Sequence, residues 1–121
     1  MTIPLKERVL PLLDWLSPAA RAIGAVNTIY RAADGSLAGE NTDWLGIREP
    51  IARLLASRSV RHECAALVIG GGGTARAALY AMQQLGFTGP RLLLFNPRTP
   101  RKAKDLAAEF HATGGKPLCW L

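Results

Sequence analysis

The chain has 121 residues, of which 49% are hydrophobic and 20% charged, a size that suits one small soluble domain and leaves no room for two complete ones. No apolar run approaches the roughly 20 residues of a membrane-spanning helix, and the N-terminus lacks the basic-then-apolar order of a secretory signal, so no membrane partner is expected. Cys64 and Cys119 have neither metal-ligand nor disulfide-framework spacing. This indicates a cytoplasmic protein in a reducing compartment, without a metal site.

The net charge of +6 is concentrated in the second half of the chain. Residues 1–50 contain five Lys or Arg and six Asp or Glu, whereas residues 51–121 contain ten and three. The segment 91–104 holds five of these basic residues and no acidic residue. Such a cluster can bind a phosphate group, attract acidic ligands or form a solvated face, and charge alone favours the solvated face. We expect no nucleic acid to bind this segment.

Residue patterns in the first half predict helices and a hairpin. Residues 7–16 carry apolar side chains at helical spacing, and Ser17-Pro18 is typical of a capped helix start. Residues 25–30 have the composition of a strand, and Asp34-Gly35 is a turn that returns this strand as a hairpin.

A further helix is predicted over residues 42–56, at the end of the first half. Asn41 or Thr42 is expected to cap it, and Pro50 to kink or restart it. The following residues, 57–65, separate two differently patterned halves of the chain.

The second half predicts alternating strands and helices. Residues 65–69 form a continuous apolar run, as expected of a strand buried on both faces of a parallel sheet. A helix is predicted over residues 74–85, a second apolar strand over residues 91–95 and an amphipathic helix over residues 100–110. This order indicates an α/β fold with a parallel sheet. Residues 111–121 do not continue the pattern.

A glycine-rich segment lies between the first of these strands and its helix. Gly70, Gly72 and Ala75 satisfy the pattern G-x-G-x-x-G/A, in which the glycines permit a tight turn and the approach of a pyrophosphate to the backbone. The helix N-terminus offers free N–H groups and a positive dipole end to the phosphates. A flexible turn is the alternative, but the position between strand and helix favours a dinucleotide site. The residues of this site are Gly70, Gly71, Gly72, Gly73 and Thr74.

The end of the second strand indicates which dinucleotide binds. NAD-binding folds place an Asp or Glu there for the ribose hydroxyls, whereas an arginine accommodates the 2′-phosphate of NADP. Asn96, Arg98 and Thr99 follow this strand, with Arg101 and Lys102 close behind and no carboxylate among them. The expected cofactor is therefore NADP.

Three polar residues of the first half are candidates for chemistry. Lys6 and Asp43 each lie at a predicted helix start, and a lysine and a carboxylate within reach of each other form a proton-transfer pair. Chemistry alone favours the alternative, a surface lysine and an aspartate that only begins a helix. Asn27 lies inside the apolar strand, where a buried amide needs partners that substrate hydroxyls can supply.

Four motifs, in this order, resemble those of the shikimate/quinate dehydrogenase family. They are Thr2-Ile3-Pro4-Leu5-Lys6, Ile23-Gly24-Ala25-Val26-Asn27-Thr28, Gly39-Glu40-Asn41-Thr42-Asp43 and the segment from Gly70 to Ala77. The resemblance runs from Thr2 to about Phe110. The residues of these motifs are similar to those of fungal members, including the last domain of the pentafunctional arom polypeptide and its regulatory relatives.

The resemblance implies a fold and an activity. Residues 1–60 would be the C-terminal part of a substrate-binding α/β domain, and residues 61–121 the N-terminal part of an incomplete Rossmann domain with a doubly wound parallel sheet. The implied reaction is reversible hydride transfer between shikimate and NADP, which gives 3-dehydroshikimate. Its implied residues are Lys6 and Asp43 as the catalytic pair, Thr2, Lys6, Asn27 and Asp43 for substrate, and Gly70, Gly71, Gly72, Gly73, Thr74, Asn96, Arg98 and Thr99 for the cofactor.

Two departures from the family pattern matter. The family reads Asn-Arg-Thr after the second Rossmann strand, whereas Pro97 separates Asn96 from Arg98 here. Arg101 or Lys102 is therefore an alternative ligand of the 2′-phosphate. Family members are also about twice this length. We expect a fragment or truncated gene model that lacks the serines which grip the substrate carboxylate, and that is inactive by itself.

Three interpretations stay open. The chain represents an NADP-dependent dehydrogenase of aromatic amino acid biosynthesis, acting on a substrate of the shikimate or quinate class. Alternatively, it represents a non-catalytic regulatory relative, similar to a quinate repressor, that binds pathway metabolites. The third interpretation is an inactive remnant whose unpaired strand edges and exposed apolar faces promote association. A place within a larger multifunctional polypeptide is compatible with the resemblance.

Overall fold

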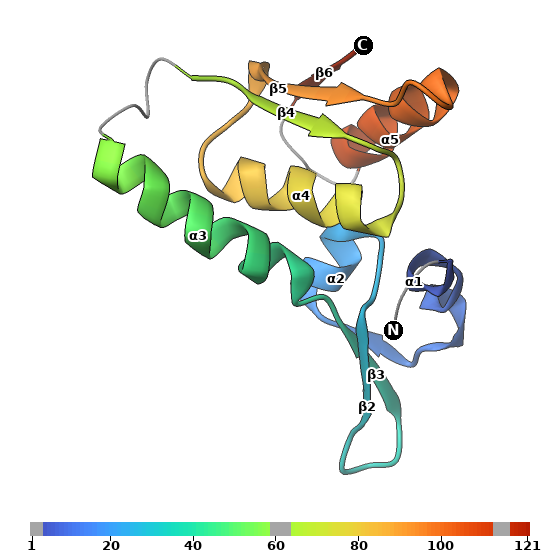
Figure 1. Ribbon diagram of the computed structural model, residues 1–121. Coiled ribbons are helices and arrows are strands. Elements are labelled where there is room, and N and C mark those ends of the chain that lie inside the picture. The colour runs from blue at the N-terminus through green and yellow to red at the C-terminus, as the bar shows by residue number, and fades with distance from the viewer. Residues whose placement is uncertain (1–3, 59–63, 113–116) are drawn as a thin grey trace.

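The structure is a computed structural model that describes residues 4–58, 64–112 and 117–121. Within these residues the chain forms two three-stranded sheets, and helices lie between the second sheet and the hairpin of the first (Figure 1). The helices are α1 (Leu5–Arg8), the 3-10 turn η1 (Leu10–Leu12), α2 (Pro18–Ile23), α3 (Asp43–Arg58), α4 (Gly73–Gln84) and α5 (Pro100–Ala112). The strands are β1 (Trp15–Leu16), β2 (Thr28–Arg31), β3 (Leu37–Glu40), β4 (Ala66–Ile69), β5 (Gly89–Phe95) and β6 (Leu118–Trp120).

The first sheet has the strand order β1-β3-β2. Strands β2 and β3 form the predicted antiparallel hairpin, and Thr28 lies opposite Glu40. The Asp34 side chain accepts a hydrogen bond from the backbone N–H of Ser36, and Gly35 has a φ of 88°. The positive φ explains why this turn needs glycine.

The helix predicted over residues 7–16 is wrong, because the segment breaks into three short elements. Helix α1 ends at Arg8, η1 contains Pro11, and the chain then becomes β1. Proline has no N–H for a helical hydrogen bond. Trp15 and Leu16 pair instead with Ala38 and Gly39 in a parallel ladder. Long-range pairing therefore overrides the local periodicity.

The start of α2 is confirmed as a capped helix. The Ser17 hydroxyl oxygen accepts a hydrogen bond from the Ala20 N–H at 3.0 Å, and Pro18 occupies the first helical position. The helix ends at Gly24, whose φ of 69° is the left-handed conformation usual for a helix C-terminus. The strand predicted over residues 25–30 begins only at Thr28.

Helix α3 runs through Pro50 as one element, so the predicted restart at this proline is wrong. The position is exposed, where water can replace the lost backbone hydrogen bond. Helix α3 packs against α4, and the Trp44 ring meets the Tyr80 ring edge-on with a 5.1 Å centroid separation. This packing attaches the first half of the chain to the second.

The second sheet is parallel with strand order β4-β5-β6, which confirms the expected α/β fold. The expectation that residues 111–121 do not continue the pattern is wrong. Strand β6 pairs with β5, and Cys119 lies opposite Leu93. Three residues are too few for a recognisable alternation, so the sequence signal is weak.

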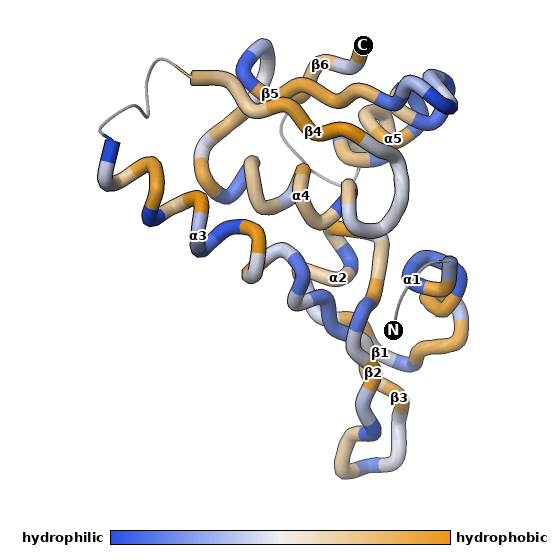
Figure 2. The backbone as a smooth tube through the Cα atoms, viewed as in Figure 1, coloured by the Kyte–Doolittle hydropathy of each residue, from blue (hydrophilic) through white to orange (hydrophobic). Residues whose placement is uncertain are grey.

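The core lies where α4 and α5 cover one face of this sheet. Its fully buried side chains include Leu79, Leu92, Leu94 and Phe110. Figure 2 shows β4 and β5 as strongly hydrophobic segments above these helices. Ala103, Leu106 and Phe110 are buried on one face of α5, as the amphipathic pattern predicts.

The prediction that β4 is buried on both faces is wrong. Leu67 and Ile69 are 52% and 66% exposed, whereas Val68 is 8% exposed. Ile69 lies beside Phe95 of β5, which is 37% exposed. Both helices lie on the Val68 side, and within the described residues the other face carries no covering layer. The expected exposed apolar face is therefore present. Within the described residues β4 pairs with β5 alone, so its other edge is unpaired, as also expected.

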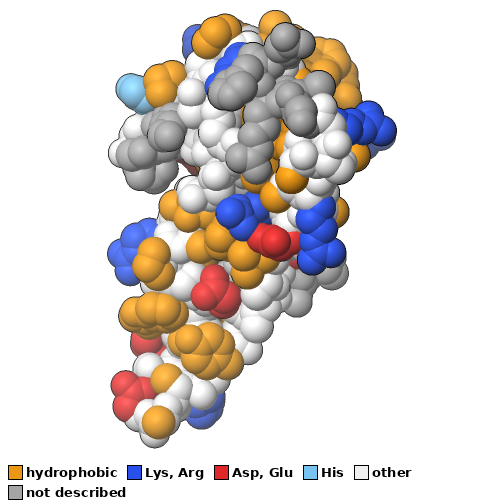
Figure 3. Space-filling view, turned by 90° about the vertical axis from the view of Figure 1, so that its left-hand side faces the viewer, with side chains coloured by type: hydrophobic (Ala, Val, Ile, Leu, Met, Phe, Trp, Pro, Cys, Tyr) orange, Lys and Arg blue, Asp and Glu red, His pale blue; other side chains and the backbone are white. Residues whose placement is uncertain are grey.

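Hydrophobic side chains also reach the surface elsewhere. They are visible in the lower part of the space-filling view, around the hairpin (Figure 3). Trp15 of β1 and Tyr30 of β2 are each nearly half exposed. Among the described residues, no helix combines the length and the apolar character that crossing a membrane requires.

Candidate active site

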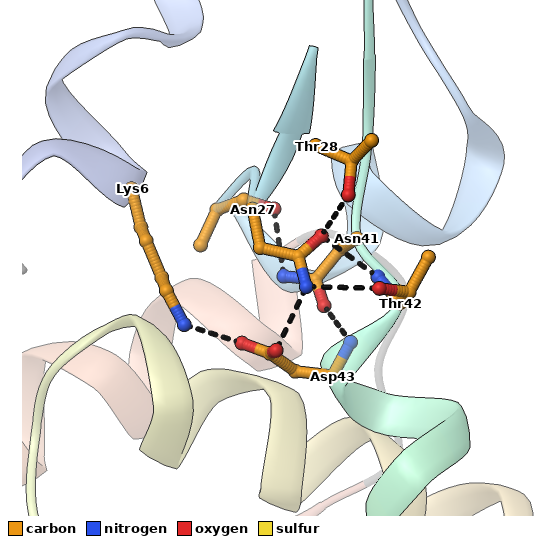
Figure 4. Close-up of polar contacts among 7 residues, drawn as sticks. Lys6, Asn27, Thr28, Asn41, Thr42 and Asp43 are labelled. Atoms are coloured by element: carbon orange, nitrogen blue, oxygen red, sulfur yellow. Dashed lines mark hydrogen bonds and ion pairs between the residues drawn. The ribbon is translucent and has the colours of Figure 1, made fainter. Parts of the chain in front are cut away.

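Lys6 and Asp43 lie in direct contact, although 37 residues separate them in the chain. The Lys6 ammonium donates to Asp43 Oδ2 at 2.5 Å, and the two side chains are 11% and 26% exposed. Helix α1 carries Lys6 and the first turn of α3 carries Asp43 (Figure 4). The Val26 N–H donates to the Lys6 carbonyl at 2.8 Å and so ties α1 to the segment between α2 and β2.

The Asn27 amide completes this cluster. Its Nδ2 donates to Asp43 Oδ1 at 2.7 Å and to the Thr42 hydroxyl at 3.0 Å, while its Oδ1 accepts from the Thr42 N–H at 3.0 Å. The expectation of a buried amide within a strand is wrong, because Asn27 is half-buried and precedes β2. Protein groups supply partners for the amide, which thereby orients Asp43.

Asn41 supports the pair and is fully buried. Its Nδ2 donates to the Ala25 carbonyl at 3.0 Å, and its Oδ1 accepts from the Asp43 N–H at 3.1 Å. This contact is an Asx turn that satisfies the first N–H of α3. The Gly46 N–H donates to the Thr42 carbonyl, so of the two predicted caps Thr42 holds the N-cap position and Asn41 supplies the side-chain hydrogen bond. An Asn two residues before a helix-start Asp is a recognisable turn signal.

The environment of Asp43 stabilises its charged form. Burial raises the pKa of this carboxyl, but hydrogen bonds from Lys6 and Asn27 and the positive charge of Lys6 outweigh that effect. The pKa of Asp43 therefore lies below its ordinary value. Asp43 is a carboxylate at neutral pH and can hold the lysine Nζ in a fixed place.

A cavity of about 420 Å³ lies beside the pair and is lined by α1 residues that include Lys6, by Gly71–Gly73, and by residues between Asn96 and Lys102. Gly70, which precedes these glycines, has a φ of 134°, and its N–H donates to the Phe95 carbonyl at 2.9 Å. Glycine is required for this turn, as the dinucleotide pattern predicts.

The glycine-rich segment fits a pyrophosphate. A Cβ built on Gly72 meets no atom within 4 Å, so the backbone there is open to a ligand. Gly72 is the N-cap of α4, and among the described residues no side chain makes a capping hydrogen bond there, so the first N–H groups of α4 are available to phosphate oxygens. Thr74 lies in the first turn of α4 and lines a second cavity of about 460 Å³, between α3, β4 and α4.

The structure separates the basic residues that follow β5. Arg98, Thr99 and Lys102 line the 420 Å³ cavity, so Pro97 does not turn Arg98 away from it. Arg101 is absent from the wall of this cavity, its side chain is 91% exposed, and its charge partner is Asp105 at 4.0 Å. Of the two alternatives to Arg98, only Lys102 is placed to meet a ligand there.

Comparisons with known proteins show which family the chain is similar to. Residues 1–29 match the profile of the shikimate dehydrogenase substrate binding domain. The pentafunctional AROM polypeptide of Malassezia globosa is 49% identical over 114 residues, which cover 90% of this chain and 7% of that polypeptide. The chain belongs to the shikimate/quinate dehydrogenase family. The resemblance inferred from the four motifs is thereby confirmed.

Solved structures of this family have the same fold. Shikimate 5-dehydrogenase from Thermus thermophilus, in complex with NADP(H) and shikimate, is 38% identical with a TM-score of 0.72. Quinate dehydrogenase from Corynebacterium glutamicum, in complex with NAD, is 31% identical with a TM-score of 0.75. Each match covers 99% of this chain, which spans 40% and 41% of those two chains.

The structure thus brings most of the predicted residues of this family member together. Lys6, Asn27 and Asp43 form one cluster, and Lys6 also lines the cavity beside the glycines. Thr2 lies outside the described residues. Asn96 lines the cavity but is only 8% exposed. Its Oδ1 accepts a hydrogen bond from the Thr99 N–H at 3.3 Å, so part of its hydrogen-bonding capacity is used within the protein.

Proposed function

We propose that the protein carrying this chain transfers a hydride reversibly between shikimate and NADP, giving 3-dehydroshikimate in the forward direction. The observation that carries the proposal is that Lys6 belongs to two sites at once. Its Nζ contacts Asp43, and its side chain lines the cavity of the glycine-rich segment. Lys6, the candidate proton-transfer group, thus also lines the cavity proposed for the dinucleotide. This arrangement suits the oxidation of a secondary alcohol.

The chain's own residues would handle the proton. Bound NADP supplies the hydride acceptor. Lys6 Nζ is held beside Asp43 and can exchange a proton with the substrate hydroxyl. Asp43 and Asn27 fix the position of this nitrogen, and both carry polar atoms that can also hold neighbouring hydroxyls of the substrate.

The choice of NADP is supported by the residues after β5. Arg98 and Lys102 offer positive charge in the cavity, and no carboxylate follows the strand at this position. The Thermus thermophilus relative is in complex with NADP(H) and shikimate. We assign Gly70, Gly71, Gly72, Gly73 and Thr74 to the pyrophosphate and Asn96, Arg98 and Thr99 to the adenosine end, with Thr2 as an additional substrate ligand.

The proposal extends to the domain organisation and the location of the protein. We infer a substrate-binding part over residues 1–60 and a nucleotide-binding part over residues 61–121. We also infer a cytoplasmic protein within a multifunctional polypeptide, in line with the AROM relative. The 121 residues by themselves are expected to lack turnover, since this chain spans only 40% and 41% of the two solved relatives.

The test is shikimate-dependent reduction of NADP by the purified protein that carries these residues. Lys6→Met is expected to lower kcat by at least about a hundredfold while shikimate still binds. Asp43→Asn keeps the shape of the side chain and removes its charge, and is expected to lower kcat as well. The proposal fails if the unaltered protein binds shikimate without turnover, which would favour a regulatory relative.

Quinate is the second candidate substrate. The similarity to the Corynebacterium glutamicum quinate dehydrogenase favours it, since that match has a TM-score of 0.75. Both compounds should therefore be assayed with NADP and with NAD. Higher kcat/KM for quinate with NAD would replace the shikimate proposal by this one.

A further inference from the structure

Gly73, the first residue of α4, lies directly beneath the side chain of Lys6. A Cβ built on Gly73 would come within 3.0 Å of Lys6 Cβ and 3.2 Å of Lys6 Cδ, with Ala25 Cβ at 3.4 Å. The first two distances are shorter than ordinary van der Waals contact. Gly73 is buried and does not have a positive φ. Glycine is therefore needed at this position because the Lys6 side chain already fills the volume that a Cβ would occupy.

The preceding glycine faces a different way. Gly72 has an extended backbone with a φ of −104°, and a Cβ there meets no atom within 4 Å. One glycine thus opens toward the cavity, whereas the next supports the stem of the lysine. The dinucleotide pattern requires glycine at position 72 but leaves position 73 open, so it does not account for Gly73.

One turn along the same helix, Arg76 reaches the residue that follows Lys6. Arg76 Nε lies 3.5 Å from Glu7 Oε2, and Arg76 Nη2 donates to Glu109 Oε2 of α5 at 2.6 Å. The Arg76 side chain is 13% exposed, and its Nε is buried without a hydrogen-bond partner in the described part of the chain. Its Nη1 lies 3.0 Å from where a Cβ on Gly24 would stand. Arg76, for which the sequence predicted no role, therefore ties α1 to α5 through a confined guanidinium.

Residues three apart on a helix share a face, so Gly73 and Arg76 present one surface of α4 to α1. We propose that Gly73 and Arg76 are positioning residues that set where Lys6 Nζ lies relative to Asp43. The consequence for turnover rests on the proposed function, whereas the geometric consequence does not. The same first turn of α4 would then hold the cofactor pyrophosphate and the lysine, so that both are placed by one rigid element.

Two neighbouring glycine substitutions separate these roles. Gly73→Ala is expected to lower kcat at least about tenfold, because a displacement of about 1 Å at a reacting group can cost a hundredfold. Alanine keeps the backbone N–H through which residue 73 would hold the pyrophosphate, so the Kd for NADP, measured by calorimetry, is expected to rise less than in Gly72→Ala. Gly72→Ala is expected to show the reverse, with weakened NADP binding as the main effect. Alanine favours a helix interior over glycine, so Gly73→Ala does not weaken α4 by propensity. Glycine is preferred to alanine at an N-cap, so thermal unfolding checks that the Gly72→Ala protein is folded.

A structural readout makes the test independent of activity. In a crystal structure of the Gly73→Ala protein, the Lys6 side chain is expected to shift by a few tenths of an ångström, so that the distance between Lys6 Nζ and Asp43 Oδ2 is longer than in the unaltered protein. An unchanged position of Lys6, or a kcat equal to that of the unaltered protein, overturns the proposal. If the unaltered protein does not oxidise shikimate, the proposed function fails, and the Lys6–Asp43 separation still decides the positioning role.

Arg76 supplies a second test that does not depend on the folding of the Gly73 variant. Arg76→Met is expected to lower kcat more than Arg76→Lys, since lysine keeps a positive charge near Glu7. Both variants are expected to keep the Kd for NADP, and thermal unfolding checks that both are folded. Equal losses of kcat, or a loss matched by weaker NADP binding, would remove Arg76 from the proposal.

Discussion

The carboxamide of Asn96 lies against the backbone of Gly71, where a Cβ would come within 2.5 Å of Asn96 Nδ2. Asn96 is 8% exposed, and its Oδ1 accepts a hydrogen bond from the Thr99 N–H. The amide cannot move aside without losing this bond. This contact joins the glycine-rich segment to the loop after β5, the two parts of the proposed nucleotide site.

Gly71→Ala is expected to displace Asn96 and the loop that carries Arg98. Gly71 has no positive φ, so the effect comes from the collision and not from backbone strain. Loss of one hydrogen bond costs about 1 kcal/mol, and with the displaced loop the Kd for NADP should rise about tenfold. Calorimetric titration of NADP measures this change.

The double variant Gly71→Ala/Asn96→Ala tests the cause. Removing the Asn96 amide relieves the collision. The double variant should therefore bind NADP more tightly than the sum of the two single changes in binding free energy predicts. Strictly additive effects would show that the two residues act separately.

Cofactor preference should depend on Arg98. Its guanidinium can hold a phosphate by two charge-assisted hydrogen bonds, each worth on the order of 1.5–3 kcal/mol, so a preference for NADP over NAD of at least about tenfold is expected. Arg98→Ala should erase most of this preference and leave the Kd for NAD nearly unchanged. Lys102→Ala should reduce it less, because an ammonium binds phosphate as a point charge.

Arg101→Ala is the matched control for these two substitutions. It removes the same charge from the same segment, but the side chain is 91% exposed and lies outside the cavity wall. The NADP preference should therefore persist. A preference lost in Arg101→Ala and kept in Arg98→Ala would reverse the assignment.

The pKa of Asp43 provides a test by pH. Burial raises this pKa, but the hydrogen bonds from Lys6 and Asn27 outweigh it and leave the pKa below the ordinary value. The carboxylate therefore stabilises the folded state at pH values above its unfolded pKa of about 3.9. This contribution is lost as the pH falls through the lower folded pKa. Lys6→Met removes a hydrogen bond and a charge, so the Asp43 pKa should rise.

Carbon-13 NMR titration of the Asp43 carboxyl measures this shift. Arg31→Met is the control, since it removes the same unit of charge from a residue that donates to the Gly35 carbonyl in the hairpin turn. The Asp43 midpoint should stay in place in this variant. An equal rise in both variants would mean that net charge, and not the contact with Lys6, sets the pKa.

The exposed apolar face of the second sheet should make the polypeptide 1–121 self-associate. Leu67 and Ile69 lie on this face, and exposed apolar patches of this kind promote association. Sedimentation of the unaltered polypeptide should show larger species as concentration rises, and Leu67→Lys/Ile69→Lys should shift them toward monomer. Leu12→Lys alters a leucine that is also exposed but lies outside this sheet, and it should have no such effect. Monomeric unaltered polypeptide at all concentrations would contradict the prediction.

Local signals in the sequence determined several elements of this protein. The cap at Ser17, the turn at Asp34-Gly35 and the glycine-rich start of α4 were all predicted and are all present. Each depends on contacts between residues close in the chain, so the residue types suffice. The same holds for the four motifs, which name Lys6 and Asp43 as candidates without placing them together.

Only the tertiary structure decided how distant residues meet. The Lys6–Asp43 contact and the packing of Lys6 on Gly73 depend on where α1, α3 and α4 pack. The exclusion of Arg101 from the cavity depends on how α5 packs. Strands β1 and β6 form because a partner strand lies beside them, and β4 is exposed on one face because both helices cover the other. Hydrogen bonding to a neighbouring strand and burial beneath a neighbouring layer are properties of the partner as much as of the segment, and so no local pattern specifies them.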